Sequence, residues 1–184
     1  DYQAKYDNAN KKALRNIYTY DTSAEDLTEV DRKTKGKGEL TSEDIFSGAS
    51  GREKIEQTFM YEVGSITTRR DYEYNGRILA NVYTFDVSEG VATEAEKRSK
   101  SNIIYNADGT INFASSTFTG TMEEEQVFEG TQGHERISQS LTYVKDAITG
   151  AYSIETRKDY AYEGKALANV YTFDVSEGVA TEAE

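Results

Sequence analysis

The 184-residue sequence contains no cysteine and no proline, and His134 is its only histidine. Without cysteine there is no disulfide framework and no thiolate chemistry. Proline is excluded from central strands, so its absence is typical of a chain built from paired strands and tight Gly, Asn and Asp turns. A lone histidine excludes histidine metal clusters and a Ser-His-Asp triad repeated along the chain.

Long apolar runs and an excess of positive charge are missing as well. No stretch approaches the roughly 20 apolar residues that span a bilayer, so we expect no membrane insertion. With 33 acidic and 21 basic residues the net charge is −12, which argues against nucleic acid as a partner. The chain starts at Asp1 and stops at Glu184, both in polar sequence, and we expect it to be an excised or processed piece of something longer.

Tyrosine, by contrast, is abundant, with 14 copies, and threonine, valine and isoleucine recur in runs. Hydrophobic residues make up only 36% of the chain, and the mean hydropathy is −0.74. Disordered chains are poor in aromatic and β-branched residues. We therefore expect a folded chain with a thin core and a large solvated surface.

An internal repeat organises the sequence. Residues 68–96 and 156–184 are identical at 24 of 29 positions, and 18 consecutive positions match from Leu79 and Leu167 onward. A diverged third copy opens the chain, and GREKIEQTFMY at 51–61 parallels GHERISQSLTY at 133–143. The repeat predicts unit one at 1–70, unit two at 71–158 and the start of unit three at 159–184.

Unit two is longer than unit one, mainly through 17 additional residues around Asn102–Phe118. This insertion contains YNADGTI at 105–111, a turn sequence that predicts an extra hairpin with flanking strands. A stack of hairpins can gain or lose one member, whereas a closed barrel or a sandwich tolerates such a change poorly.

Alternation of apolar and polar residues predicts strands separated by glycine turns such as Asn75-Gly76 and Glu163-Gly164. One face of 54–63 carries Ile55, Gln57, Phe59, Tyr61 and Val63. Helical spacing is weak, and Ala92–Lys97 is the best short exception. We predict an all-β fold: an antiparallel β-hairpin repeat array, either a meander or a β-solenoid, elongated along one axis.

The segment 79–87 differs from the other predicted strands because both of its faces are apolar. Leu79, Tyr83 and Phe85 point one way, and Ile78, Ala80, Val82 and Thr84 point the other. We expect this strand to be covered on both sides, by a second layer or by a neighbouring chain.

The sequences YEYNGRILANVYTFD at 72–86 and AYEGKALANVYTFD at 161–174 resemble bacterial YD/Rhs-type repeats. Repeats of that family have a Tyr-Asp or Tyr-x-Tyr lead, an x-Gly-Arg/Lys turn, a following leucine and an aromatic strand end. Tyr6-Asp7 with Leu14 and Tyr20-Asp21 is a looser match. The resemblance implies a large secreted or surface hairpin array, of the kind that wraps into shells around toxins or acts in adhesion and carbohydrate contact.

Residue types that carry chemistry do not assemble into a recognisable site. The sequence NADGT at 106–110 resembles half of a calcium loop, but a turn is the better interpretation because the downstream ligands are missing. The cluster Glu123-Glu124-Glu125 suggests weak calcium binding or, preferably, a solvated strand edge. Paired carboxylates for glycoside hydrolysis stay open from sequence. We predict no catalytic, cofactor-binding or metal-binding residues and no enzymatic activity.

The repeated aromatic residues are the candidate packing or assembly positions. They are Tyr72, Tyr74, Tyr83 and Phe85, with their copies Tyr160, Tyr162, Tyr171 and Phe173. Three interpretations apply, in order of preference: cross-strand packing, contacts between chains or units, and stacking on sugars.

The sequence thus predicts a structural repeat protein, a segment of a bacterial extracellular or cell-surface fibre. Its expected partner is itself, through strand pairing between neighbouring repeats or protomers. The alternatives are an adhesin or carbohydrate-binding module that contacts surface glycans through the Tyr/Phe faces, and part of an Rhs-like toxin shell.

Overall fold

The computed structural model describes residues 2–7 and 13–176 and divides into two compact units. The first unit comprises Asp1–Asp71 and Asp86–Ser99, and the second comprises Tyr72–Phe85 and Lys100–Glu184. Each unit is therefore built from two separate stretches of the chain. The limits of the units differ from those of the sequence repeats.

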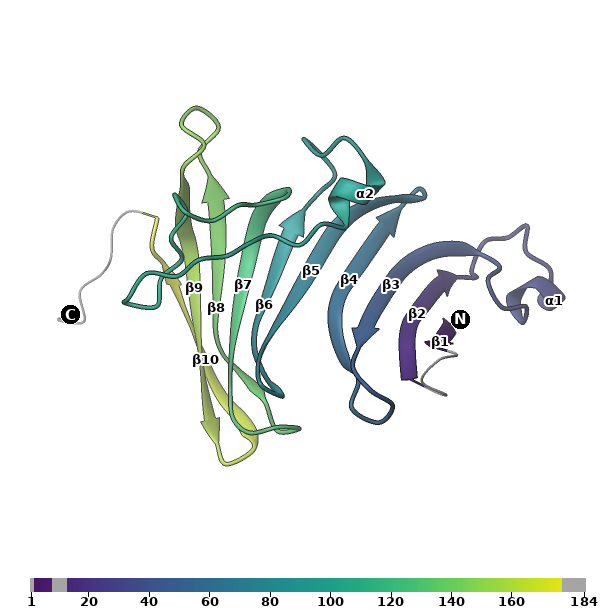
Figure 1. Ribbon diagram of the computed structural model, residues 1–184, viewed down its shortest axis with the longest axis horizontal. Helices are drawn as coiled ribbons and strands as arrows, with labels where there is room; N and C mark the ends of the chain where they lie inside the picture. Colours follow the sequence, from purple (N-terminus) through teal and green to yellow (C-terminus); the bar gives the residue numbers. More distant parts are fainter. Residues whose placement is uncertain (1, 8–12, 177–184) are drawn as a thin grey trace. The chain divides into compact units, whose positions relative to one another are not determined.

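Each unit is a β meander in which hydrogen-bonded strands follow the order of the sequence (Figure 1). The first unit contains β1 (Tyr2–Asp7), β2 (Ala13–Asp21), β3 (Glu39–Ser47), β4 (Lys54–Glu62) and most of β5 (Ser65–Asn75). The second contains the end of β5, β6 (Ile78–Asp86), β7 (Thr121–Glu129), β8 (Arg136–Lys145), β9 (Tyr152–Glu163) and β10 (Ala166–Asp174). The prediction of an antiparallel β meander is confirmed, and the strand order is not that of a β-solenoid. The repeat array and its elongation stay predictions.

β-Bulges interrupt the strand ladders at equivalent places in the two units. The register shifts lie between Ile45 and Phe46, Val127 and Phe128, Met60 and Tyr61, and Thr142 and Tyr143. A bulge bends its strand and increases the local twist, so the two copies of the repeat have the same irregularities of backbone. Strict alternation also fails at the strand end: Val63, assigned above to the apolar face, lies in the turn after β4 with φ of 49° and is 94% exposed.

Two short helices, α1 (Glu29–Arg32) and α2 (Glu94–Lys97), lie in the loops after β2 and β6. Both begin with a capping box, in which a threonine side chain accepts a hydrogen bond from the third helical N–H and an acidic residue there accepts one in return. The capping pairs are Thr28 with Asp31 and Thr93 with Glu96. Neither helix is long or apolar enough to cross a membrane, nor is any other helix in the described ranges.

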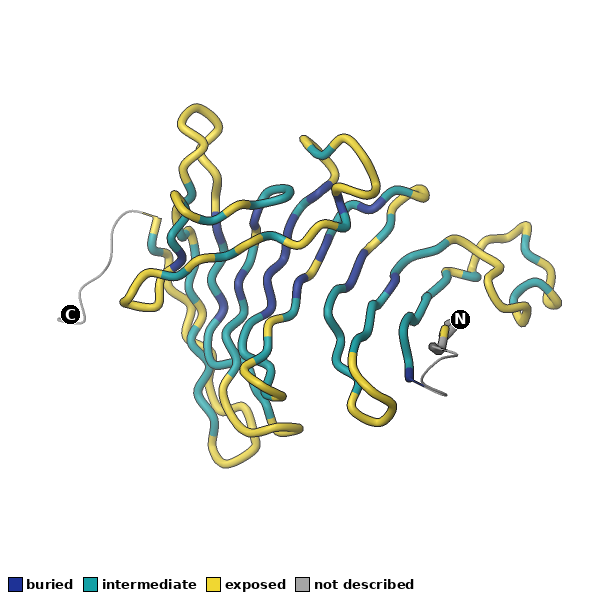
Figure 2. The backbone as a smooth tube through the Cα atoms, in the orientation of Figure 1, coloured by how far each residue is buried: buried dark blue, intermediate teal, exposed yellow. Residues whose placement is uncertain are grey.

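The core of each unit is thin, and it includes polar groups. The first unit buries Phe59, Ile66 and Val87 together with the charged side chains of Arg69 and Lys97. The second buries Val82, Tyr83, Phe85, Ile111, Met122 and Tyr143. Most other strand residues are half-buried or exposed, as Figure 2 shows.

The insertion in the second unit is not the regular hairpin that the sequence suggests. Its turn forms, with the Asn106 N–H donating to the Thr110 carbonyl at 2.8 Å. The flanking segments, however, pair only through the isolated bridges Asn102–Thr117 and Tyr105–Ile111. The insertion lies instead as an irregular cover that brings Tyr105, Phe113 and Phe118 against the strands.

Two glycines in the β7–β8 loop provide a test of backbone geometry. A Cβ at Gly130, where φ is +119°, would lie 2.6 Å from the His134 carbonyl oxygen, whereas a Cβ at Gly133, where φ is +77°, meets nothing within 4 Å. We expect Gly133→Ala to destabilise by about 1 kcal/mol through its positive φ alone, and Gly130→Ala to destabilise clearly more. Urea unfolding of both variants measures the difference, and equal losses would contradict the close approach.

Candidate functional site

A buried glutamate is the centre of a polar network in the second unit. Glu125 of β7 is only 3% exposed. Its Oε1 accepts hydrogen bonds from Asn81 Nδ2 at 2.7 Å and from the Tyr105 hydroxyl at 2.8 Å, and its Oε2 accepts one from the Tyr143 hydroxyl at 2.9 Å. The donors come from β6, the insertion and β8, so one carboxylate ties together the strands on both of its sides.

The first unit contains the same arrangement at the equivalent positions of the repeat. Glu43 of β3 is 4% exposed. Its Oε1 accepts from Asn16 Nδ2 of β2 at 2.8 Å, and its Oε2 accepts from the Tyr61 hydroxyl of β4 at 3.1 Å. Asn16 and Asn81, Glu43 and Glu125, and Tyr61 and Tyr143 are therefore matched pairs.

The two networks differ in the group that supplies the remaining donor. In the first unit Arg98, which follows α2, forms an ion pair with Glu43 at 2.7 Å and lies over the Phe59 ring at 4.6 Å. In the second unit the Tyr105 hydroxyl supplies this donor to Glu125, and it also contacts the Tyr83 hydroxyl. The insertion thus replaces a guanidinium by a neutral phenol.

The tyrosines of these networks stay protonated at neutral pH. Burial raises the pKa of Tyr83, Tyr105 and Tyr143 far above the ordinary value, and it raises that of Tyr61 to about 12. Such phenols act as permanent hydrogen-bond donors. Because the glutamate oxygens are occupied by these donors, the arrangement suits the stabilisation of a sheet better than proton transfer.

A second repeated cluster lies on β4 and β5, and again on β8 and β9. In the first unit Arg69 pairs with Asp71 at 3.2 Å, and Gln57 donates to Asp71 at 2.8 Å. The last carbonyl of α2 and the one after it cover this cluster, because Lys97 O accepts from Arg69 Nη1 and Arg98 O accepts from Gln57 Nε2. In the second unit the cluster consists of Arg157, Asp159 and Gln139.

A glutamate of each long hairpin loop binds the backbone of a neighbouring strand. Glu53 Oε1 accepts from the Leu14 N–H at 3.0 Å, and Glu135 Oε1 accepts from the Leu79 N–H at 3.4 Å. Hydrogen bonds from backbone N–H groups lower the pKa of both carboxyl groups. The N–H of the glutamate itself has the largest effect, and the leucine N–H adds to it. Leu14 and Leu79 are again equivalent positions of the repeat.

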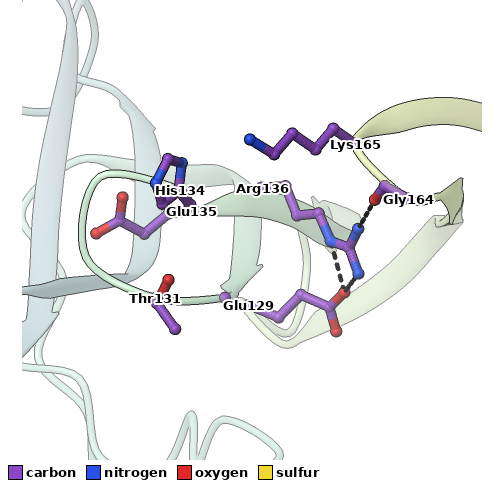
Figure 3. A pocket seen from close by; sticks show the side chains of 8 residues that line it. Glu129, Thr131, His134, Glu135, Arg136, Gly164 and Lys165 are labelled. Atoms are coloured by element: carbon purple, nitrogen blue, oxygen red, sulfur yellow. Dashed lines mark hydrogen bonds and ion pairs between the residues drawn. The ribbon is translucent and has the colours of Figure 1, made fainter.

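An open hollow of about 570 Å³ lies beside the β7–β8 loop. Its lining includes His134, Arg136 and Lys165 (Figure 3). Three of its charged groups, Glu129, Glu135 and Arg136, are engaged in structural contacts. Arg136 donates to Glu129 at 3.0 Å and to the Gly164 carbonyl at 2.9 Å. The exposed His134 has no serine or carboxylate hydrogen-bonded to it among the described residues.

A second hollow, of about 510 Å³, is bordered by aromatic residues. Phe113 and Tyr152 stack with ring centroids 5.0 Å apart, and Phe118 lies 5.4 Å from Tyr152. Lys145 and the Thr149–Ala151 loop provide the polar border. None of these aromatic residues belongs to the set that the repeat singled out.

The repeated aromatics of the sequence prediction occupy contrasting environments. On β6, Tyr83 is 3% exposed and Phe85 is fully buried, whereas their copies on β10, Tyr171 and Phe173, are 52% and 38% exposed. The other members of the set, Tyr72, Tyr74, Tyr160 and Tyr162, are half-buried. Tyr162 donates to the Ile137 carbonyl at 2.9 Å.

Sequence reasoning missed the glutamates and asparagines of the networks. Glu125 was assigned to a solvated edge or to weak calcium binding, and it is instead buried. No group of three or more His, Asp or Glu residues suited to a metal lies within residues 2–7 and 13–176. The sequence signal that identifies the site is the match of Glu43 with Glu125 between the two copies. Each glutamate is followed, after one intervening residue, by an aliphatic residue and then phenylalanine.

Replacement of Glu125 tests the network. Glu125→Gln offers one acceptor and an NH₂ group to three donors, so we expect a loss of about 1.5–3 kcal/mol in the free energy of unfolding. The matched control is Glu155→Gln, an exposed carboxylate of β9, which we expect to change stability by less than about 0.5 kcal/mol. Equal effects in chemical unfolding would show that Glu125 is not the organising group.

The loop glutamates predict a pH dependence. Because the pKa of Glu135 is lowered on folding, its stabilisation is present above the unfolded value of about 4.3 and is lost as the pH falls through the folded pKa. We expect the urea midpoint to fall between pH 5 and pH 3, and to fall less in Glu135→Gln, which keeps an acceptor but cannot ionise. An unchanged slope in this variant would exclude the Leu79 contact as a source.

Comparisons with known proteins identify no family for the chain. No family model and no curated protein matches it, so the resemblance to YD/Rhs-type repeats stays a prediction. The chain is similar to the crystal structure of a protein of unknown function from Bacteroides fragilis, at 8% identity, over 85% of this chain and 90% of that chain, with a TM-score of 0.35.

Proposed function

We propose that the chain is a non-catalytic structural repeat protein, a segment of a bacterial extracellular or cell-surface fibre that assembles by strand pairing between repeats or protomers. The observation that carries the proposal is the contrast between β6 and β10. The sequence from Leu79 to Asp86 recurs unchanged from Leu167 to Asp174. The first copy forms β6, which lies beside β7. The second copy forms β10, which is the last strand in the strand order.

On β6 the shared residues are covered within the second unit. Asn81 binds Glu125 of β7, Tyr83 contacts Tyr105, and the Phe85 ring lies 6.3 Å from that of Phe118. On β10 the equivalent residues face solvent, with Leu167, Val170, Tyr171 and Phe173 all exposed. Burial of a Val, Leu or Phe side chain is worth about 1.5–3 kcal/mol, so covering this edge supplies a driving force for association.

Edge strands of soluble proteins are ordinarily short, charged or covered. β10 has a nine-residue length, and four of its residues are exposed large hydrophobics. Such an edge favours the addition of a further strand, with main-chain hydrogen bonds for affinity and side-chain matching for register. This supports assembly through β10.

A carbohydrate-binding module is the alternative function, and one observation favours it. The aromatic hollow beside Phe113, Phe118 and Tyr152 combines half-buried rings with a polar border at Lys145. A glycan array with the Tyr152→Ala variant as its control tests this alternative: retention that depends on Tyr152 supports it.

A charged residue in β10 tests the assembly. We expect the chain to self-associate with rising concentration, and Val170→Lys to abolish the association because a buried lysine opposes strand pairing. The control is Ile148→Lys, which changes an equally apolar residue that is 95% exposed in the β8–β9 loop. Light scattering and negative-stain images report the outcome, and a wild-type chain that stays monomeric at all concentrations contradicts the proposal.

A further inference from the structure

Two other strands of the chain, β2 and β6, are equivalent in sequence to β10, and the structure shows which strand lies beside each of them. β2 and β6 carry the asparagine and tyrosine at equivalent positions, Asn16 with Tyr18 and Asn81 with Tyr83. In both cases the next strand of the meander supplies a buried glutamate to the asparagine, at 2.8 Å and 2.7 Å. β10 repeats the pair as Asn169 and Tyr171, and both are exposed.

The strands that cover β2 and β6 share a short pattern. β3 contains Glu43-Asp-Ile-Phe-Ser-Gly48, and β7 contains Glu125-Gln-Val-Phe-Glu-Gly130, so both read Glu-x-aliphatic-Phe-x-Gly. The loop that follows each strand adds a second glutamate, Glu53 or Glu135, which accepts the backbone N–H of Leu14 or Leu79. The equivalent N–H on β10 belongs to Leu167.

We propose that β10 is the binding site for an extended polypeptide segment with the pattern Glu-x-aliphatic-Phe-x-Gly. The segment lies antiparallel to β10, its first glutamate accepts a hydrogen bond from Asn169, and the glutamate of its following loop accepts the Leu167 N–H. This inference rests on the proposed assembly through β10, and it adds the chemistry and the register of the partner.

The register follows from the first unit. In the β2–β3 pair, Asn16 lies opposite Ile45 and Tyr18 lies opposite Glu43. Transferred to β10, the aliphatic residue of the partner lies opposite Asn169 and its glutamate lies opposite Tyr171. A slip of one residue would turn the glutamate to the other face and away from Asn169, so the carboxylate selects the register.

A peptide of this chain serves as the probe. Residues 121–136, TMEEEQVFEGTQGHER, contain the β7 strand and its loop glutamate. We expect the labelled peptide to bind the full chain saturably in fluorescence anisotropy, and the same peptide with Glu125→Gln to bind roughly tenfold more weakly or worse. Hydrogen exchange should show new amide protection in β10 on binding.

Variants of the full chain locate the site. We expect Asn169→Ala to weaken peptide binding roughly tenfold or more, and Asn102→Ala, the same change at an exposed asparagine of the insertion, to leave it unchanged. Absence of binding, or binding that is insensitive to both the glutamate and Asn169, overturns the inference.

The outcome separates this inference from the proposed function. If the peptide binds in this way while the chain stays monomeric, the partner chemistry holds and the fibre is wrong. If Val170→Lys abolishes self-association but the peptide does not bind, assembly through β10 holds and the partner pattern is wrong.

Discussion

The structure depends on a buried carboxylate whose hydrogen bonds are supplied by its neighbouring strands. Glu43 and Glu125 each lie on the middle strand of three, with an asparagine on one side and a tyrosine on the other. A buried charge without such partners is strongly destabilising, so the three strands stabilise one another through the shared carboxylate. In a chain with little hydrophobic core, this polar link gives each unit a definite register where apolar packing alone would permit slippage.

The two networks also show how an insertion can be accommodated. In the first unit Arg98 balances the charge of Glu43 directly, whereas in the second unit the insertion supplies Tyr105. Phe113 of the same insertion stacks on Tyr152, and Phe118 lies beside Tyr152 and Phe85. The additional residues therefore extend the core of their unit without adding a strand, which explains why the regular strand order survives a considerable difference in length between the two copies.

Much of the strand pattern could be predicted from the sequence, because alternation and glycine turns are local signals. The meander, the turn at Asn75-Gly76 and the equivalence of the two copies follow from them. Burial could not be predicted in the same way. Glu125 sits among glutamates and resembles a solvated edge, and its burial depends on donors from β6, the insertion and β8 that are distant in sequence. The bulges and the place of Val63 likewise depend on pairing geometry rather than on composition.

The near-identity of β6 and β10, which differ only at Ile78 and Ala166, has a consequence for how the chain reaches its native pairing. During folding β7 encounters two strands that present the same side chains, so contact chemistry does not distinguish the correct neighbour from the other. The distinction comes from the insertion between β6 and β7, whose Tyr105 and Phe118 contact Tyr83 and Phe85 of β6.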